Sequence, residues 1–230
     1  MKIGFGVFCF GDKVYYEGAY NKILNIIGSG YDCYVLTEDV NYFKDIDKLN
    51  IIPYLREYKS YHDKLKLPKY ILNDCDVCIL IDADLNINDY SFLDDLRHYN
   101  FKDGISYIDI LLNHPERKEC VRELNLSSVE WKNYTDYCDL IYTDFRDIKL
   151  IWEYFLVINK NGFNDDFYLH YEKLQIEKEK CYSNNDVNAP GEGISMTISA
   201  FLSNIKIGRD IELYNKLKDN IFSVSSKFTR

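Results

Sequence analysis

Two aspartates separated by one small residue, Asp82 and Asp84, directly follow the apolar run Val77–Ile81. An uncompensated pair of carboxylates at the edge of a hydrophobic core is unfavourable, so a positive group is expected beside them. Carboxylates at positions i and i+2 in the turn after a strand can both reach one hard cation. Mg²⁺ or Mn²⁺ prefers such oxygen ligands and keeps coordination sites free for substrate phosphates. The pair therefore predicts a metal site, and the structural alternative is a strand-end turn exposed to water.

The elements before this pair predict a parallel sheet. Ile3–Phe10 has the composition of a buried strand, residues 16–27 show apolar side chains at helical spacing, and Asp32–Thr37 is typical of a second strand. The run Val77–Ile81 is continuously apolar, as in an interior strand covered on both faces. Consecutive β-α-β units gather their ligands at the carboxyl ends of the strands. The two aspartates are expected at such an end.

The rest of the chain continues the α/β pattern without an internal repeat or a linker, which indicates a single domain over residues 1–230. We expect a mostly polar helical stretch at Asn50–Asn73 and two further strands at Gly104–Asn113 and Trp152–Asn159. A solvated charged helix is expected at Lys173–Lys180 and a buried helix at Ile194–Leu202.

Length and composition exclude several classes of protein. The 230 residues are 47% hydrophobic, which is enough for a sizeable core, and disorder is not expected. The net charge of −9 disfavours broad capture of nucleic acid or anionic membrane, although a local basic patch could bind either. We expect no transmembrane segment and a cytoplasmic protein, because no long apolar run and no cleavable leader is present. The seven cysteines are scattered and expected to be reduced, and Cys75 and Cys78 lack a second pair at zinc-site spacing.

Other sites with paired carboxylates fit less well. An EF-hand starting at Asp82 would need a glycine where Ile87 stands and a glutamate where Leu93 stands. A haloacid-dehalogenase-like phosphohydrolase would use Asp82 as its nucleophile, but that motif normally lies on the first strand and continues to a threonine. It stays as an alternative, since Asp165-Asp166 could serve as the downstream acidic pair. A nuclease would need a basic groove, and the chain is acidic.

The chain resembles the GT-A glycosyltransferases, which transfer sugars from nucleotide-sugar donors. The resemblance covers roughly the first 90 residues, through the segments IGFGVFCF, DCYVLTED, KLKLPKYILNDC and ILIDADL. Further along, EYFLVINKNGF and PGEGISMTISAFL are similar to the retaining glycogenin-like and blood-group-transferase-like branches. The resemblance implies a Rossmann-like, mostly parallel central sheet flanked by helices, with a nucleotide-binding half in residues 1–90 and an acceptor-side half with a C-terminal tail in residues 91–230.

The resemblance also implies an activity. It is the metal-dependent transfer of a hexose from a UDP- or GDP-sugar, with UDP expected ahead of GDP, to an unidentified hydroxyl acceptor. Asp82 and Asp84 would bind Mn²⁺ or Mg²⁺ together with the donor diphosphate, and the metal would act as a Lewis acid on the leaving nucleoside diphosphate. Retention of configuration is favoured by analogy alone. A sugar-nucleotide-binding protein without turnover is the alternative that is not an enzyme.

Several other residues have roles implied by the resemblance. The residues that close the first strand, Phe8, Cys9 and Phe10, and Asp39 after the second strand, would contact the base and ribose of the nucleotide. The basic residues ahead of the motif, Arg56 and Lys66, would contact the donor. For each basic residue, the alternative is a solvated helix charge. His170 is the candidate third metal ligand, with side-chain packing as its alternative.

The second half of the chain adds one acidic and two basic candidates. Glu192, which opens the buried helix, is predicted with Asp84 to be catalytic, by contacting a sugar or stabilising a developing positive charge. Its alternative role is to complement the helix dipole. Residues 206–230 carry six basic and three acidic side chains, a net charge of +3. Lys227 or Arg230 is expected to fold over the diphosphate once donor is bound.

Overall fold

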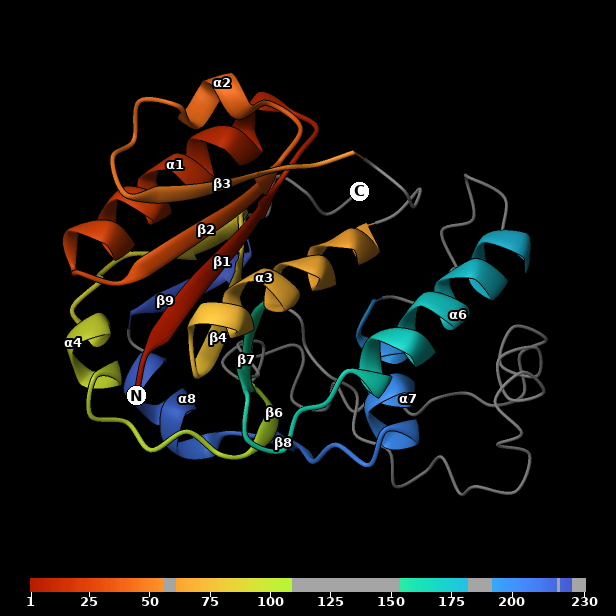
Figure 1. Ribbon diagram of the computed structural model, residues 1–230. Helices are drawn as coiled ribbons and strands as arrows, with labels where there is room; N and C mark the ends of the chain where they lie inside the picture. Colours follow the sequence, from red (N-terminus) through yellow and green to blue (C-terminus); the bar gives the residue numbers. More distant parts are fainter. Residues whose placement is uncertain (56–60, 109–153, 182–191, 219, 225–230) are drawn as a thin grey trace.

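The computed structural model describes residues 1–55, 61–108, 154–181, 192–218 and 220–224. Within these residues, seven strands form one sheet in the order β3-β2-β1-β4-β7-β6-β8 (Figure 1). The strands are β1 (Ile3–Cys9), β2 (Asp32–Thr37), β3 (Leu49–Pro53), β4 (Val77–Asp82), β6 (Gly104–Tyr107), β7 (Phe155–Asn159) and β8 (Ile207–Arg209). β7 is antiparallel to both of its neighbours, and the other described pairs in this sheet are parallel. The predicted α/β class with a mostly parallel central sheet is confirmed.

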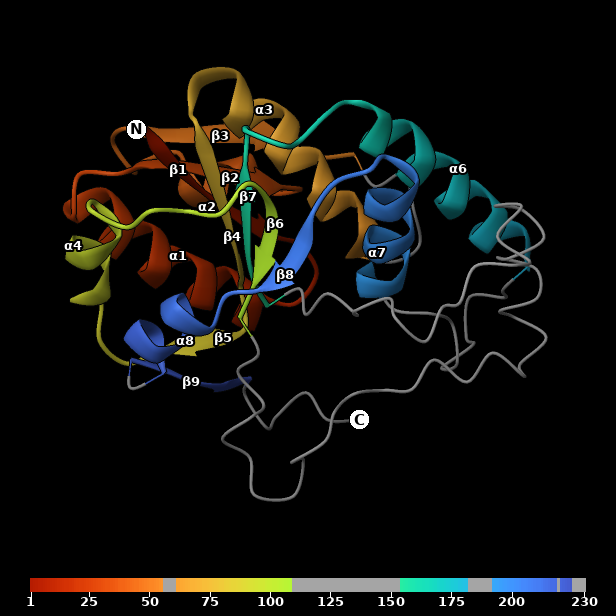
Figure 2. The ribbon, with the colours of Figure 1, turned by 90° about the horizontal axis from the view of Figure 1, so that it is seen from below.

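Helices cover both faces of the sheet. In the described residues they are α1 (Lys13–Gly28), α2 (Val40–Phe43), α3 (Leu67–Asp74), α4 (Phe92–Leu96), α6 (Asp166–Cys181), α7 (Glu192–Leu202) and α8 (Ile211–Leu217), and the 3₁₀ helix η1 (Tyr61–Lys66) leads into α3. Figure 2 shows α1 on one side of the sheet and α3 on the other. Each face has its own hydrophobic core, one built with α1, α4 and α8, the other with α3, α6 and α7.

The alternation of residues along β1 explains the two cores. Phe5 and Val7 are fully buried in the core beneath α1. Gly4 and Gly6 face α3, where a Cβ on Gly6 would lie 2.7 Å from a Leu80 methyl carbon and 2.8 Å from one of Ile71. Glycine therefore lets α3 pack directly on the strand backbone.

The stretch Asn50–Asn73, predicted to be mostly polar and helical, begins instead as an edge strand, so the prediction is wrong for its first residues. β3 pairs in parallel with β2, which places Ile51 opposite Val35. A strand at the edge of a sheet has one free side and contains polar and exposed residues. It therefore lacks the continuous apolar run of an interior strand that is covered on both faces. The helical part of the prediction holds from η1 onward, and Pro68 lies in the first turn of α3.

The other predicted elements are found with small shifts in their bounds. β6 ends at Tyr107, and residues 109–113 of the predicted strand lie outside the described part of the chain. β7 begins at Phe155, and residues 152–153 also lie outside it. The charged helix and the buried helix are α6 and α7. None of the helices in the described residues is long and apolar enough to cross a membrane.

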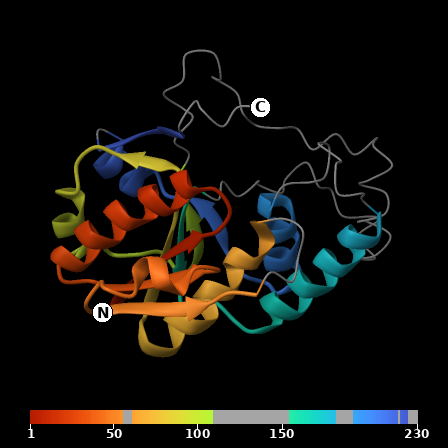
Figure 3. The same cartoon turned by 90° about the horizontal axis from the view of Figure 1, so that it is seen from above.

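A short second sheet follows the aspartate pair. β5 (Leu85–Ile87) pairs antiparallel with β9 (Ile221–Val224), and Val224 lies opposite Leu85. Figure 3 shows the yellow β5 beside the dark blue β9. The C-terminal part of the described chain therefore returns to the residue that follows Asp84.

Candidate functional site

The Asp82–Ala83–Asp84 turn lies at the carboxyl end of an interior strand, as predicted. Asp82 is the last residue of β4, which lies between β1 and β7. Phe8 on β1 is in register with Asp82, so the ends of these parallel strands meet at one edge of the sheet. Asp82 and Asp84 are both partly exposed there, and Ala83 between them is buried.

Lys64 supplies a positive charge to the first aspartate. Its Nζ lies 3.2 Å from Oδ1 of Asp82, and the two side chains are 6% and 21% exposed. Lys64 comes from η1, just before the helix that packs on β1 and β4. Lys66 was the candidate from the sequence, and its Nζ instead lies 2.9 Å from Oδ1 of the buried Asp63. Lys64 was not among the residues singled out from the sequence, and the predicted contact of Lys66 with the donor stays a prediction.

A second lysine supports the turn from the opposite face of the sheet. Lys22 on α1 is 4% exposed, and its Nζ donates to the carbonyl oxygens of Ala83 at 2.7 Å and Gly18 at 3.2 Å. Burial lowers the pKa of Lys22 to about 8, against the charges of Asp84 and Asp82, which raise it. The positive groups expected beside the carboxylates therefore include two lysines of the chain itself. Sequence reasoning missed Lys22 because it lies 60 residues before the pair.

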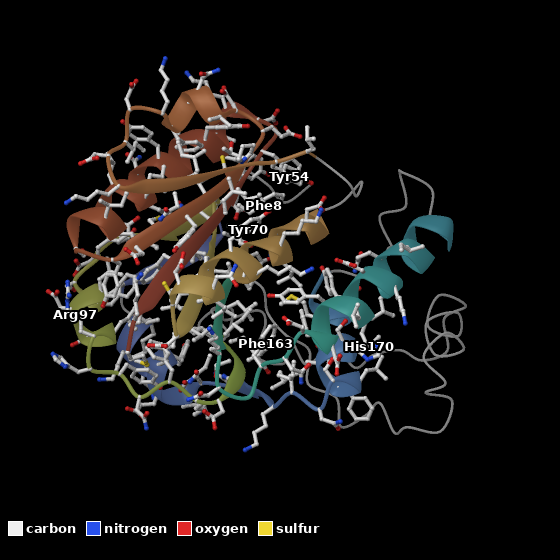
Figure 4. All side chains as sticks on the ribbon, in the orientation of Figure 1. Phe8, Tyr54, Tyr70, Arg97, Phe163 and His170 are labelled. Carbon is white, nitrogen blue, oxygen red and sulfur yellow. The ribbon has the colours of Figure 1, made fainter. Side chains whose placement is uncertain are left out.

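The two carboxylates lie close enough to affect one another. The pKa of Asp84 is raised, first by burial and then by the charge of Asp82, while Lys22 and Lys64 lower it. Two oxygen donors of this kind fit Mg²⁺ or Mn²⁺, because such a cation takes its remaining ligands from water and substrate phosphates. In the described part of the chain, no three histidine, cysteine, aspartate or glutamate side chains are grouped as metal ligands. His170 lies on α6 (Figure 4), so its role as third ligand stays a prediction.

Aromatic rings line the same edge of the sheet. The ring centroid of Phe8 lies 4.7 Å from that of Phe10 and 5.2 Å from that of Tyr54, and Figure 4 shows Phe8 and Tyr54 side by side. The backbone N–H of Tyr54 donates to Thr37 at the end of β2. Cys9 points to the other face, where burial raises the pKa of its thiol to about 12. Of the predicted base contacts, the structure thus brings the two phenylalanines together, and it adds Tyr54.

The remaining predicted residues are less well defined. Asp39 follows β2, is exposed, and caps α2 by accepting a hydrogen bond from Tyr42 N at 3.2 Å. Glu192 opens α7, but its side chain lies outside the described part of the structure, as do Arg56, Lys227 and Arg230. Their predicted contacts with donor or acceptor stay predictions.

Comparison with solved structures identifies the fold. The chain matches the galactosyltransferase LgtC in complex with donor and acceptor sugar analogues, at 15% identity and a TM-score of 0.54, over 98% of this chain and 85% of LgtC. A structure of LgtC with a substitution in its active site matches at 13% identity and a TM-score of 0.53 over the same shares. The glycosyltransferase GlyE of Streptococcus pneumoniae TIGR4 matches at 13% identity and a TM-score of 0.49, over 94% of this chain and 47% of GlyE. No known protein-family profile and no curated sequence matches the chain. The chain has the GT-A-type glycosyltransferase fold.

Proposed function

We propose that this protein transfers a hexose from a nucleotide sugar, a UDP-sugar ahead of a GDP-sugar, to a hydroxyl acceptor with the help of Mn²⁺ or Mg²⁺. The observation that carries the proposal is the turn with Asp82 and Asp84 at the end of β4, with Lys64 on Asp82. A pair of hard oxygen ligands beside a buried lysine ammonium suits a diphosphate, which needs neutralising charge on more than one side. The fold shared with LgtC supports the same conclusion.

Each described residue of the site has a role in this proposal. Asp82 and Asp84 hold the cation, which when bound supplies positive charge to the leaving nucleoside diphosphate. The ammonium of Lys64 can then turn to a phosphate oxygen, because Asp82 has a second positive partner. Phe10, which is partly exposed, offers its ring to the nucleotide base, and the buried rings of Phe8 and Tyr54 pack against it. Base-on-ring stacking is favourable for every base.

The residues of the second half complete the proposal. Glu192 contacts a sugar or stabilises positive charge at the reacting carbon, and retention of configuration is proposed with it. Lys227 and Arg230 approach the diphosphate from the tail. The pairing of Val224 with Leu85 supports a role for the tail, because Lys227 follows Val224 by three positions. Three residues of extended chain span about 10 Å, so Lys227 starts from a point close to the aspartate turn.

The two alternatives predict different measurements. The phosphohydrolase is not favoured, because the chain has the glycosyltransferase fold. It would release inorganic phosphate from an aryl phosphate, with Asp82 as its nucleophile. A sugar-nucleotide-binding protein without turnover would bind donor and never hydrolyse it.

The test is a thermal-shift panel of nucleoside diphosphates and nucleotide sugars with Mn²⁺, with Mg²⁺ and with a chelator. A ligand that binds only the folded state raises Tm by mass action. We expect UDP or a UDP-sugar to raise Tm with Mn²⁺ and to have little effect with the chelator. Slow release of free sugar from the same UDP-sugar would then separate the enzyme from a binding protein. Failure of every nucleotide in the panel to shift Tm would reject the proposal.

A further inference from the structure

We propose that Lys22 is a positioning residue, which fixes the Asp82–Ala83–Asp84 turn by holding the Ala83 carbonyl and so presents both carboxylates to the same cation. The cation that the turn would bind comes from the proposed function, and the inference rests on that function to this extent. The contact between Lys22 and the turn does not depend on the proposed function. Lys22 lies behind the turn, on the α1 side of the sheet, and therefore does not contact the reacting groups.

The first observation is the hydrogen bond from Lys22 to the peptide between the two aspartates. Nζ of Lys22 lies 2.7 Å from the carbonyl oxygen of Ala83, in a buried environment. This carbonyl belongs to the same peptide plane as the N–H of Asp84. Holding the oxygen toward α1 therefore fixes the orientation of that plane, and with it the direction in which Asp84 leaves the strand. A second bond, to Gly18 O at 3.2 Å, ties the ammonium to its own helix.

The second observation is the close approach of the helix backbone to the same carbonyl. A Cβ added to Gly18 would overlap the carbonyl oxygen of Ala83, and it would lie 3.6 Å from Nζ of Lys22. α1 thus contacts the turn through a residue without a side chain and through a lysine one helical turn later. Both contacts meet at one backbone oxygen, which lies between the two proposed cation ligands.

The charge of Lys22 distinguishes positioning from simple electrostatics. A lysine ammonium near a cation site repels the cation, so its removal alone should tighten cation binding. Loss of a residue that orients cation ligands has the opposite effect and typically weakens metal affinity roughly 10–100-fold. The sign of the change in affinity therefore reveals which effect dominates.

The first experiment needs no ligand. Amide hydrogen exchange is followed in peptides covering residues 82–87 for the wild type, Lys22→Met, Gly18→Ala and Lys13→Met. Lys13 is the matched control, since it lies on the same helix with its side chain 80% exposed. We expect faster exchange at residues 82–87 in the Lys22 and Gly18 variants, with β1 and β2 unchanged. Unaltered exchange at residues 82–87 would overturn the inference. An equal increase in exchange at residues 82–87, β1 and β2 would also overturn it.

The second experiment measures the dissociation constant of Mn²⁺ by calorimetry, first without nucleotide, where the sign argument applies, and then in the presence of UDP. We expect Lys22→Met to weaken binding at least tenfold, and Lys13→Met to leave it unchanged. Unchanged or tighter binding in Lys22→Met would overturn the inference. Gly18→Ala keeps the charge and moves the carbonyl, so it decides the matter if Lys22→Met does not fold. Absence of binding to the wild type would reject the proposed function, while hydrogen exchange would still decide whether Lys22 holds the turn.

Discussion

The pair between Lys64 and Asp82 is expected to couple strongly in the ligand-free protein. At a separation of 3.2 Å, two unit charges attract by about 5 kcal/mol at an effective dielectric constant of 20, before any desolvation cost. Asp82 remains 21% exposed, and both groups lose water on folding, so most of this energy is offset. We expect a net coupling free energy of about 1–3 kcal/mol.

A double-mutant cycle measures this coupling directly. The free energy of urea unfolding is determined for the wild type, Lys64→Met, Asp82→Asn and the double variant, in the presence of a chelator. The matched control is the pair of Lys2 and Asp32, which is shorter at 2.8 Å but has side chains 55% and 41% exposed. Water and salt screen such a pair, so its coupling should be clearly smaller than that of Lys64 and Asp82.

Two results would contradict the reasoning. A Lys64–Asp82 coupling no larger than that of the control pair would show that burial does not strengthen this ion pair. Saturating Mn²⁺ should reduce the coupling, because Asp82 then has another positive partner. If the coupling is unchanged by Mn²⁺ at a concentration that shifts Tm, the cation does not bind at Asp82.

Three further predictions concern the site and its support. The pKa of Lys22 falls from 10.5 to about 8 on folding, so between these pH values the unfolded chain binds more protons than the folded chain. The free energy of unfolding should therefore rise with pH in this range, by up to about 3 kcal/mol relative to Lys22→Met. A difference between the wild type and Lys22→Met that does not change with pH in urea unfolding would contradict this. Gly104→Ala should lower the free energy of unfolding by about 2 kcal/mol, since Gly104 has φ +82° and a Cβ would overlap the carbonyl oxygen of Lys206; unchanged thermal unfolding would show that the loop relaxes freely. Replacing Lys227 and Arg230 by glutamine should weaken calorimetric binding of UDP with Mn²⁺ and leave urea unfolding unchanged, and equal affinity would remove the tail from the site.

The sheet could be predicted where strands are covered on both faces. β4 is a continuous apolar run because α1 packs on one side and α3 on the other, and this burial is visible in the sequence. The parallel β-α-β rule then placed Asp82 and Asp84 at the correct edge. β3 could not be found in the same way, because its residues Leu49–Pro53 are partly or fully exposed at the sheet edge.

The positive partners of the two carboxylates were beyond sequence reasoning. Electrostatics required a cation beside them, but it did not say whether a metal ion or a lysine supplies the charge. Lys64 precedes Asp82 by 18 residues and Lys22 by 60, and neither spacing forms a motif. They meet the turn because α1 and η1 contribute to the hydrophobic cores on opposite faces of the sheet. Tyr54 was missed for a similar reason, since its ring joins Phe8 only through the pairing of β3 with β2.

The pairing of β5 with β9 affects how the protein is made on the ribosome. Residues 85–87 leave the exit tunnel before residues 221–224, so the nascent chain carries the segment after the aspartates without its partner strand until those residues emerge. The surroundings of the aspartate turn are therefore completed only after residues 221–224 have been synthesised. A truncated translation product that stops before residue 221 would keep the parallel strands and lack the strand that borders this turn.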